Sequence, residues 1–441
     1  MHELVVRDAK VLENGKWRIT DIGVDQGKFT SFEPDSGHAT LDAKERIVLP
    51  GGLDLHVHFN EPGRTHWEGF ATGSLSAAAG GNTFLVEMPL NSIPSTVSVE
   101  SLRLKRNAIG QQSRVDYALW GGLVPGNENE LQALAQAGVA GFKAFMSPSG
   151  TDDFANSDTE TLRRGMKEIA KTGKVLALHA EDPAVLEAAN ASLPSKISAL
   201  DWEKSRPVAA EVSAIKIAIE LAAETGCRIH IVHVSSPDAL QVIVEAKALG
   251  LPITCETCPH YLLIAINEAD AIGPLSKCAP PLRDPKTVRN LWKSLRNGEI
   301  DTIGSDHSPC PPEMKIGKSF YDAWGGISGL QHGLPLLWQE ALNDPELFQI
   351  LIDLSCKSPS GLIGLDSKGS LSIGKDADFA LVEELERATP ISTADLHYRH
   401  PQSAYCDKLL RLQVSETWLR GNCVYRQGRA VGKPQGRHIT F

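Results

Sequence analysis

Short apolar segments alternate with longer stretches rich in alanine, leucine and glutamate between about residues 50 and 365. This alternation is typical of βα units that build a parallel sheet. The expected strands cover residues 51–59, 82–88, 116–122, 141–146, 175–181, 229–235, 252–257 and 300–305. Helices are expected at residues 68–80, 128–137, 159–172, 208–225, 237–248 and 285–297. A region of this size and pattern predicts an α/β fold, a (β/α)8 TIM-like barrel with long loops.

A doubly wound open sheet is the alternative for this part of the chain. Sheets of that kind usually carry a glycine-rich turn, G-x-G-x-x-G, after their first strand, where it binds a dinucleotide. No such motif follows residues 51–59. The barrel is therefore the favoured architecture.

The two ends of the chain carry a different pattern, with short β-type segments and no helical period. Asn14-Gly15 and Gln26-Gly27 have the composition of hairpin turns. Neither end is expected to close a core by itself, and chain termini often lie close together. We therefore expect residues 1–49 and 366–441 to form one composite β domain beside a barrel domain of residues 50–365.

The composition restricts the classes of partner and the cellular compartment. The formal net charge is −10 and no long basic run is present, which argues against nucleic acid or an anionic membrane surface. No segment reaches about 18 consecutive apolar residues, and the first residues do not resemble a signal peptide. Cys255-x-x-Cys258 lacks the second C-x-x-C of a zinc site, so we expect structural thiols there. These features predict a soluble cytoplasmic protein.

Histidine, lysine and aspartate residues stand near the carboxyl ends of the expected strands, where the functional residues of such barrels gather. His56 and His58 lie in the first strand, and residues two apart point to the same face. Two imidazoles about 7 Å apart along a strand can converge on one metal ion. Further polar residues end strands four, five, six and eight: Lys143, His179, His233 and Asp306. The pattern predicts a metal centre at one end of the barrel.

Each of these residues also has a simpler explanation when it is taken alone. Lys143 can pack its stem while its ammonium reaches water, and Asp306 can cap the following helix. His179 and His233 can be hydrogen-bonded core residues. Together, these explanations require several costly polar groups at equivalent strand ends, whereas one shared metal centre accounts for all of them. His230 has the opposite parity to His233, so we expect it to face the helices.

Lys143 has the position for a group that bridges two metal ions. Two divalent ions about 3.5–4 Å apart need an anion between them, and an ammonium has the wrong charge. Next to two dications the amine should lose its proton. A neutral lysine amine can add carbon dioxide to give a carbamate, which has two oxygen atoms and one negative charge. A carbamate on Lys143, an N6-carboxylysine, could therefore bridge both ions.

In chain order and strand position, these residues resemble the ligands of the binuclear metal amidohydrolase superfamily, within it the cyclic amidohydrolases: His56, His58, Lys143, His179, His233 and Asp306. The resemblance covers nearly the whole chain and implies the barrel, a β-sandwich formed by both termini, a hydroxide between the metals and a homotetramer. It places the histidines of the first strand with Asp306 on one ion, the other two histidines on the second ion, and Lys143 between them. The ligand types suit zinc, with manganese, cobalt, nickel and iron as alternatives.

Three loop segments narrow the substrate, because they resemble the allantoinases among the cyclic amidohydrolases. Asn60 stands where the similar dihydroorotases carry an arginine for the substrate carboxylate, and asparagine offers no charge for that group. Arg64 is the residue that could substitute for it. Ser308-Pro309-Cys310 stands where dihydroorotases tend to carry Ala-Pro-His, and residues 87–92, which include Asn91, are again similar to allantoinases.

The resemblance implies hydrolysis of the cyclic amide bond of (S)-allantoin to allantoate in purine and ureide degradation, with Asp306 as the acid–base residue. It also implies that the loops at Cys278, Ala279 and Ser308 hold the cyclic amide. The further expected substrate contacts are Asn60, Arg64 and Asn91. Dihydroorotase, hydantoinase and dihydropyrimidinase activities are the alternatives within this class. A non-enzymatic assembly protein on the same scaffold is less economical, since such relatives typically lose metal ligands and all six are present here.

Overall fold

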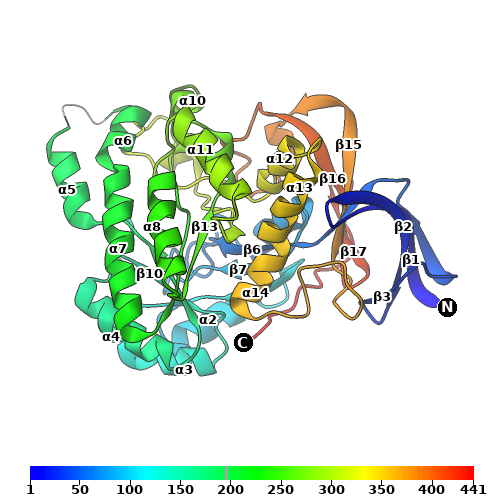
Figure 1. The fold of residues 1–441 in the computed structure, drawn as a ribbon, viewed down its shortest axis with the longest axis horizontal. Helices are drawn as coiled ribbons and strands as arrows, with labels where there is room; N and C mark the ends of the chain where they lie inside the picture. The colour runs from blue at the N-terminus through cyan, green and yellow to red at the C-terminus, as the bar shows by residue number, and fades with distance from the viewer. Residues whose placement is uncertain (194–196) are drawn as a thin grey trace.

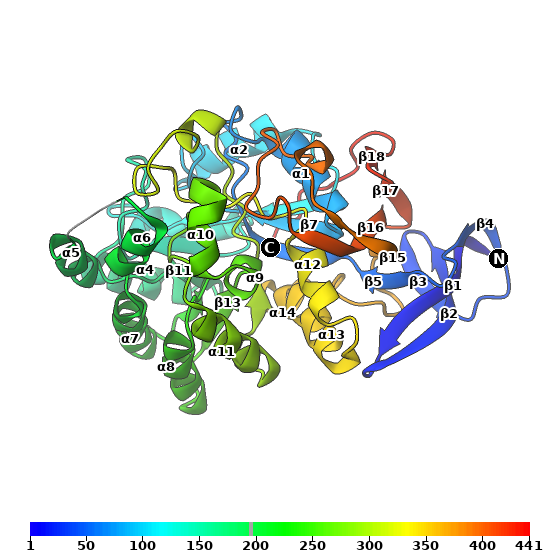
Figure 2. The same cartoon turned by 90° about the horizontal axis from the view of Figure 1, so that it is seen from above.

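The computed structural model describes residues 1–193 and 197–441 of the chain. Parallel strands surrounded by helices form its larger part, and the strands of both termini lie together beside them (Figures 1 and 2). In the described part of the chain, no helix combines the length and the apolar character that a membrane crossing requires.

The central strands are parallel and form one sheet of three strands and one of six. The first sheet contains β6 (Gly52–Val57), β7 (Asn82–Glu87) and β8 (Asp116–Leu119). The second contains β9 (Gly121–Gly122), β10 (Phe142–Phe145), β11 (Val175–His179), β12 (Arg228–Ile231), β13 (Ile253–Thr257) and β14 (Thr302–Ile303). Each strand range expected from the sequence overlaps at least one of these strands.

The two parallel sheets are joined to each other at both ends. Only Trp120 separates β8 from β9, and its backbone amide donates to the carbonyl of Glu87 over 3.0 Å. At the other end, the amide of His58 donates to the carbonyl of His307, beyond β14, over 2.8 Å. The strands therefore follow one another around a ring, which is the arrangement that the expected barrel requires.

Helices cover the outside of the ring (Figures 1 and 2). The expected helices are present as α1 (Phe70–Ala79), α3 (Leu131–Gln136), α4 (Thr159–Ala170), α7 (Val208–Thr225), α8 (Pro237–Ala248) and α11 (Pro285–Arg296). Side-chain caps fix several of their starts: Asp158 accepts from the Thr161 amide at the start of α4, over 2.7 Å.

The sequence reasoning missed a second set of helices, most of them short: α2 (Val99–Ile109), α5 (Pro183–Ala191), α6 (Ala199–Ser205), α9 (Pro259–Leu263), α10 (Ile266–Ile272), α12 (Gly333–Glu340), α13 (Pro345–Ile352) and α14 (Ser358–Ile363). The start of α2 carries a readable signal, a reciprocal capping pair of Ser98 and Ser101. Helices α12 to α14 lie between the ring and the strands of the termini (Figure 1).

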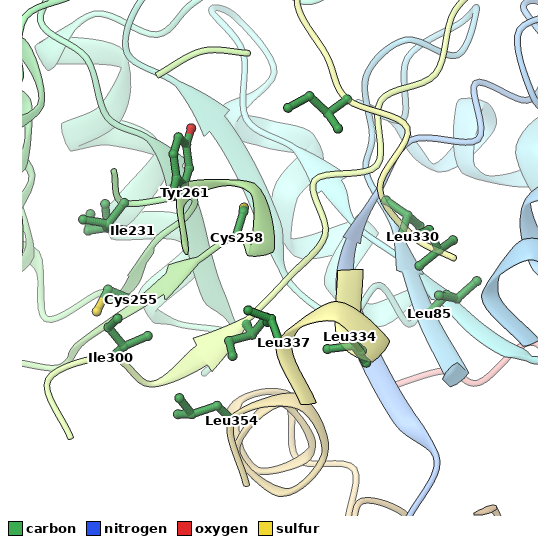
Figure 3. Close-up of a cluster of buried hydrophobic side chains, with 14 of the residues drawn as sticks. Leu85, Ile231, Cys255, Cys258, Tyr261, Ile300, Leu330, Leu334, Leu337 and Leu354 are labelled. Carbon is green, nitrogen blue, oxygen red and sulfur yellow. The ribbon is translucent and has the colours of Figure 1, made fainter. Parts of the chain in front are cut away.

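Buried apolar side chains fill the space between the strands and the helices. Leu85 and Ile231 from the strands belong to the same cluster as Leu337 of α12 (Figure 3). Cys255 and Cys258 are buried in this cluster as free thiols. Burial raises the pKa of the Cys255 thiol, which keeps it protonated and unreactive. The structural role expected for these thiols is confirmed.

The two termini share one mixed sheet of nine strands. Its members are β1 (His2–Glu13), β2 (Lys16–Asp25), β3 (Lys28–Phe32), β4 (Gly37–Asp42), β5 (Ile47–Pro50), β15 (Phe379–Pro390), β16 (Leu409–Leu419), β17 (Asn422–Arg426) and β18 (Arg429–Ala430). Antiparallel pairing of β5 with β15 joins the two ends of the chain, with Pro50 opposite Phe379. Where a sandwich of two sheets was expected, the strands of both termini form a continuous sheet with a common core around Phe29, Phe379 and Trp418.

A buried lysine connects the ring to the C-terminal segment. Lys368 Nζ lies 2.9 Å from Asp116 on β8, 3.0 Å from Asp376 and 2.5 Å from Asp378. Arg420 also pairs with Asp116. The three carboxylates lie close enough together to hold a cation, but Lys368 already occupies the space between them. This cluster is therefore a structural ion-pair network.

We expect Lys368→Met to lower the free energy of unfolding by about 3–5 kcal/mol, because it leaves buried carboxylates without their shared cation. Lys28→Met is the matched control, since half-exposed Lys28 lies 3.7 Å from the same Asp376 and should contribute less than about 1 kcal/mol. Urea unfolding measures both values. Equal effects of the two substitutions would contradict the structural role of the buried network.

Candidate metal centre and substrate cavity

A cavity of about 500 Å³ opens at the carboxyl ends of the ring strands. Its wall contains the expected histidine and aspartate ligands: His56, His58, His179, His233 and Asp306. Lys143 lies on β10 and is fully buried. The structure thus brings candidate ligands from four different strand ends to one cavity wall, and the buried Lys143 comes from a fifth strand.

His56, His58 and Asp306 form the first group of candidate ligands. Asp306 Oδ1 lies 3.2 Å from His56 Nε2 and 3.5 Å from His58 Nε2. One potential ligand atom from each residue falls within 4.8 Å of the others, which suits an ion about 2.0–2.2 Å from each. Burial opposes ionisation of Asp306, but the surrounding histidines hold the pKa of its carboxyl well below its usual range.

His179 and His233 form the second group. His179 Nδ1 lies 3.0 Å from His233 Nε2, and both rings are buried. Two nitrogen ligands of one tetrahedral ion, with bonds of about 2.0–2.1 Å, are separated by roughly 3.3 Å. The two nitrogen atoms therefore face each other at a spacing that an ion between them requires.

Two buried glutamates orient the histidines, and the sequence reasoning missed both. His56 Nδ1 lies 2.7 Å from Glu256 Oε1, and His179 Nε2 lies 2.6 Å from Glu181 Oε2. Each carboxylate accepts from one ring nitrogen and leaves the other nitrogen free to bind a metal. Arg206 pairs in turn with Glu181. In the sequence, Glu256 stands out only as a carboxylate within the strand β13. Glu181 stands out only as a carboxylate two positions after His179.

Lys143 has the environment that its expected modification needs. Its Nζ is buried without a hydrogen-bond partner among the described residues and lies 5.0 Å from the centre of the Phe145 ring. Burial lowers the pKa of this amine to about 8. The charge of this amine acts on His56 and on His179, so it lies near both histidine groups. Buried polar groups are normally satisfied, and an orphan amine at this position fits a carbamate that binds metal ions. The residues present therefore fit the binuclear centre.

Backbone conformation also marks this end of the ring. Asn60, Asn91, His233 and Asp306 have positive φ angles of 65°, 69°, 43° and 45°. Residues other than glycine adopt this region rarely and at a cost, and such residues cluster at functional sites. The positive φ values turn the chain sharply where each strand ends, and they bring these side chains to the cavity end of the ring.

His230 does not face the helices, and that expectation was wrong. Its register partner on β11 is Ala177, which packs inside the ring with Val232. The His230 ring lies 2.8 Å from Thr254 Oγ1 and is buried. The parity argument failed because the chain leaves regular strand geometry before His233, whose φ is 43°.

The expected substrate contacts divide into two sets. Asn91, Ala279 and Ser308 line the cavity, whereas Asn60, Arg64 and Cys278 are not part of its described wall. Asn60 is buried and its Nδ2 donates to the Pro309 carbonyl over 3.3 Å.

The Arg64 side chain is engaged by two other residues of the chain and does not line the cavity. Its guanidinium donates to the Asn91 carbonyl over 2.9 Å and lies 3.2 Å from Asp153. These contacts hold the strand-two loop and leave Arg64 poorly placed to bind a substrate carboxylate.

Several residues of the wall were not anticipated. Trp202 and Arg206 come from α6 and its end, and Lys277 and Trp324 come from the loops after β13 and β14. Trp202 Nε1 donates to the Cys278 carbonyl over 2.8 Å, which ties α6 to the loop after β13. Sequence patterns indicate these wall residues only weakly, because they lie away from the strand ends.

A ring of parallel strands with histidine, lysine and aspartate at one end is typical of metal-dependent hydrolases. Residues 47–424 match the amidohydrolase family. The chain belongs to this family, which confirms the resemblance inferred from the sequence.

Curated relatives are similar to this chain over almost their whole length. An allantoinase of Rubrobacter xylanophilus is 44% identical over 99% of this chain and 97% of its own length. An allantoinase of Bacillus velezensis is 43% identical over 100% of this chain and 97% of its own length. Among solved structures, an L-hydantoinase (dihydropyrimidinase) of Arthrobacter aurescens is 32% identical, with a TM-score of 0.95 and complete coverage of both chains.

Proposed function

We propose that this protein is an allantoinase, which hydrolyses the cyclic amide bond of (S)-allantoin to give allantoate. The observation that carries the proposal is identity of 44% to an allantoinase over almost the whole chain, together with a full set of candidate ligands around one cavity. Arg64 supports it against a dihydroorotase, since its guanidinium is engaged by Asp153 and the Asn91 carbonyl.

The cofactors that fit this site are two divalent ions. His56, His58 and Asp306 would hold one ion, His179 and His233 the other, and a carbamate on Lys143, formed from CO2, would lie between them. Zinc suits these ligands best, with manganese, cobalt, nickel and iron as alternatives. When bound, the ions would lower the pKa of a water molecule and polarise the ring carbonyl.

The residues of the chain bind the ring and move the proton. Asn91, Ala279 and Ser308 lie where they can orient the ring against the cavity wall. Water adds its oxygen to the ring carbonyl carbon, and the Asp306 carboxylate accepts the proton that this oxygen loses. Asp306 then returns that proton to the ring nitrogen as the C–N bond breaks. The ring opens to a carboxylic acid and a ureido NH2 group, so one water molecule is consumed for the one C–N bond that breaks, and the acid then releases its proton to solvent to give allantoate.

The remaining expectations are part of the proposal. Residues 50–365 would form a closed (β/α)8 barrel, and residues 1–49 with 366–441 would form one composite β domain beside it. We also infer a cytoplasmic homotetramer with no nucleic-acid or membrane partner. The TM-score of 0.95 to the L-hydantoinase supports the architecture.

Removal of the metal ions tests the proposal. Dialysis against a chelator should abolish allantoin turnover, and two equivalents of zinc in bicarbonate buffer should restore it, since the candidate ligands are preformed. Metal content and allantoate formation are measured on the same samples. Protein that is isolated without metal and binds none on reconstitution would favour a non-enzymatic assembly protein instead.

A further inference from the structure

Two buried lysines connect the loops that cover the cavity. The strand-seven loop comprises residues 273–284, after β13 and the short helices α9 and α10, and the strand-eight loop comprises residues 308–327, after β14. Lys277 of the first loop and Lys315 of the second are 4% and 3% exposed. We call them the lysine pair.

Three of the four hydrogen bonds formed by the lysine pair cross between the two loops. Lys277 Nζ donates to the carbonyls of Tyr321 and Ala323 over 2.5 and 2.7 Å. Lys315 Nζ donates back to the Pro274 carbonyl over 2.9 Å and to the Gly326 carbonyl over 2.5 Å. Each ammonium thus satisfies two backbone carbonyls, and each loop supplies one cation to the other.

Burial of two neighbouring ammonium groups costs free energy, because each loses its contact with water. In the described part of the chain, the bonds of both ammonium groups go to carbonyls, and neither forms an ion pair with a carboxylate. Burial lowers the pKa of Lys315 to about 8, and burial together with the charge of Lys315 lowers the pKa of Lys277 to about 8. Two neighbouring buried cations are rarely retained for stability alone.

The lysine pair is linked directly to the segments that we expect to hold the ring. Lys277 precedes Cys278 and Ala279, and its own carbonyl accepts from the Gly326 amide over 2.8 Å. Gly326, which Lys315 also binds, has a φ of 156°, and a Cβ placed there would lie 2.5 Å from the Ser308 carbonyl oxygen. A shift of either lysine would therefore move Ala279 or Ser308 in the cavity wall.

We propose that Lys277 and Lys315 are positioning residues, whose crossed hydrogen bonds hold both loops in the arrangement that binds the cyclic amide; this inference rests on the proposed function. The pair acts through the backbone of Ala279 and Ser308 and does not take part in the proton transfer of Asp306. Its loss should weaken binding of the ring more than it slows the chemical step.

The test compares Lys277→Met and Lys315→Met with Lys286→Met, which removes an exposed ammonium on α11. In both buried variants we expect KM to rise about 10-fold to 100-fold, because a misplacement of the loop backbone near 1 Å has an effect of this size. The change in kcat should be smaller, and the metal content should stay unchanged. Hydrogen exchange of peptides that cover residues 273–284 and 308–327, measured without substrate, should become faster. Lys286→Met should change none of these values.

Gly326→Ala gives a second route if a lysine variant fails to fold, because the added Cβ displaces Ser308 without removal of a charge. It should also raise KM. Unchanged KM in the folded variants, with or without faster exchange, would overturn the positioning role. If the unmodified protein opens dihydrouracil or another ring and not allantoin, the proposed substrate is wrong. The role of the lysine pair is then decided by KM for the ring that is opened, together with the exchange rates.

Discussion

Asp306→Asn should lower kcat for allantoin by about 10²- to 10⁴-fold, the range for removal of a general acid–base group. The amide keeps the shape of the carboxylate and one oxygen that can face His56 Nε2, now 3.2 Å away. It cannot accept the proton of the attacking water or return it to the ring nitrogen. Steady-state rates of allantoate formation measure the loss.

Metal content must be determined on the same protein, because Asp306 also belongs to a candidate metal group. Asp366→Asn is the control, since that carboxylate is exposed and is not part of the described cavity wall. Near-normal turnover of Asp306→Asn with two ions bound would show that another group transfers the proton.

Lys143→Met should lower activity by about 10³-fold or more and release metal ions, because no carbamate can form between them. The same substitution should leave the metal-free protein at least as stable as before. Lys143 Nζ has no hydrogen-bond partner among the described residues, so its removal relieves a desolvated amine and breaks no bond. Thermal unfolding of the metal-free proteins measures the second effect.

Lys105→Met is the matched control for stability. Lys105 is also fully buried, but its Nζ lies 3.3 Å from Glu87 and 3.0 Å from the Met88 carbonyl. Loss of this partnered lysine should lower the free energy of unfolding by about 3–5 kcal/mol.

In Lys143→Ala, added formate should restore part of the activity, since a small carboxylate can replace the carbamate. A fully active, metal-loaded Lys143→Met variant would refute the bridging role.

The order of strands and the residues at their ends could be read from the sequence, because both depend on local patterns. Alternation along β6 and the apolar runs that end at His179 and Asp306 are properties of single segments. His230 shows the limit of this approach. Its orientation depends on the irregular backbone before His233, and no period of two can predict that irregularity.

Contacts between distant segments could not be predicted. Glu256 lies 200 residues from His56, yet its carboxylate orients that ring over 2.7 Å. One composite β domain from both termini was expected, but the specific pairing of β5 with β15 that joins them is likewise a tertiary property. The wall residues Trp202 and Lys277 belong to the same class, since only the folded chain brings α6 to the loop after β13.

The most direct test of this account is allantoate formation by the metal-loaded protein, with dihydroorotate and dihydrouracil measured alongside under identical conditions. We expect strong turnover of allantoin and little of the other two rings. For dihydroorotate the reason is its carboxylate, since Asn60 supplies no cation and Arg64 is engaged by Asp153. For dihydrouracil the expectation rests on the similarity of the whole chain to allantoinases. Preferred turnover of dihydroorotate or dihydrouracil, with two ions bound, would contradict the assignment as an allantoinase.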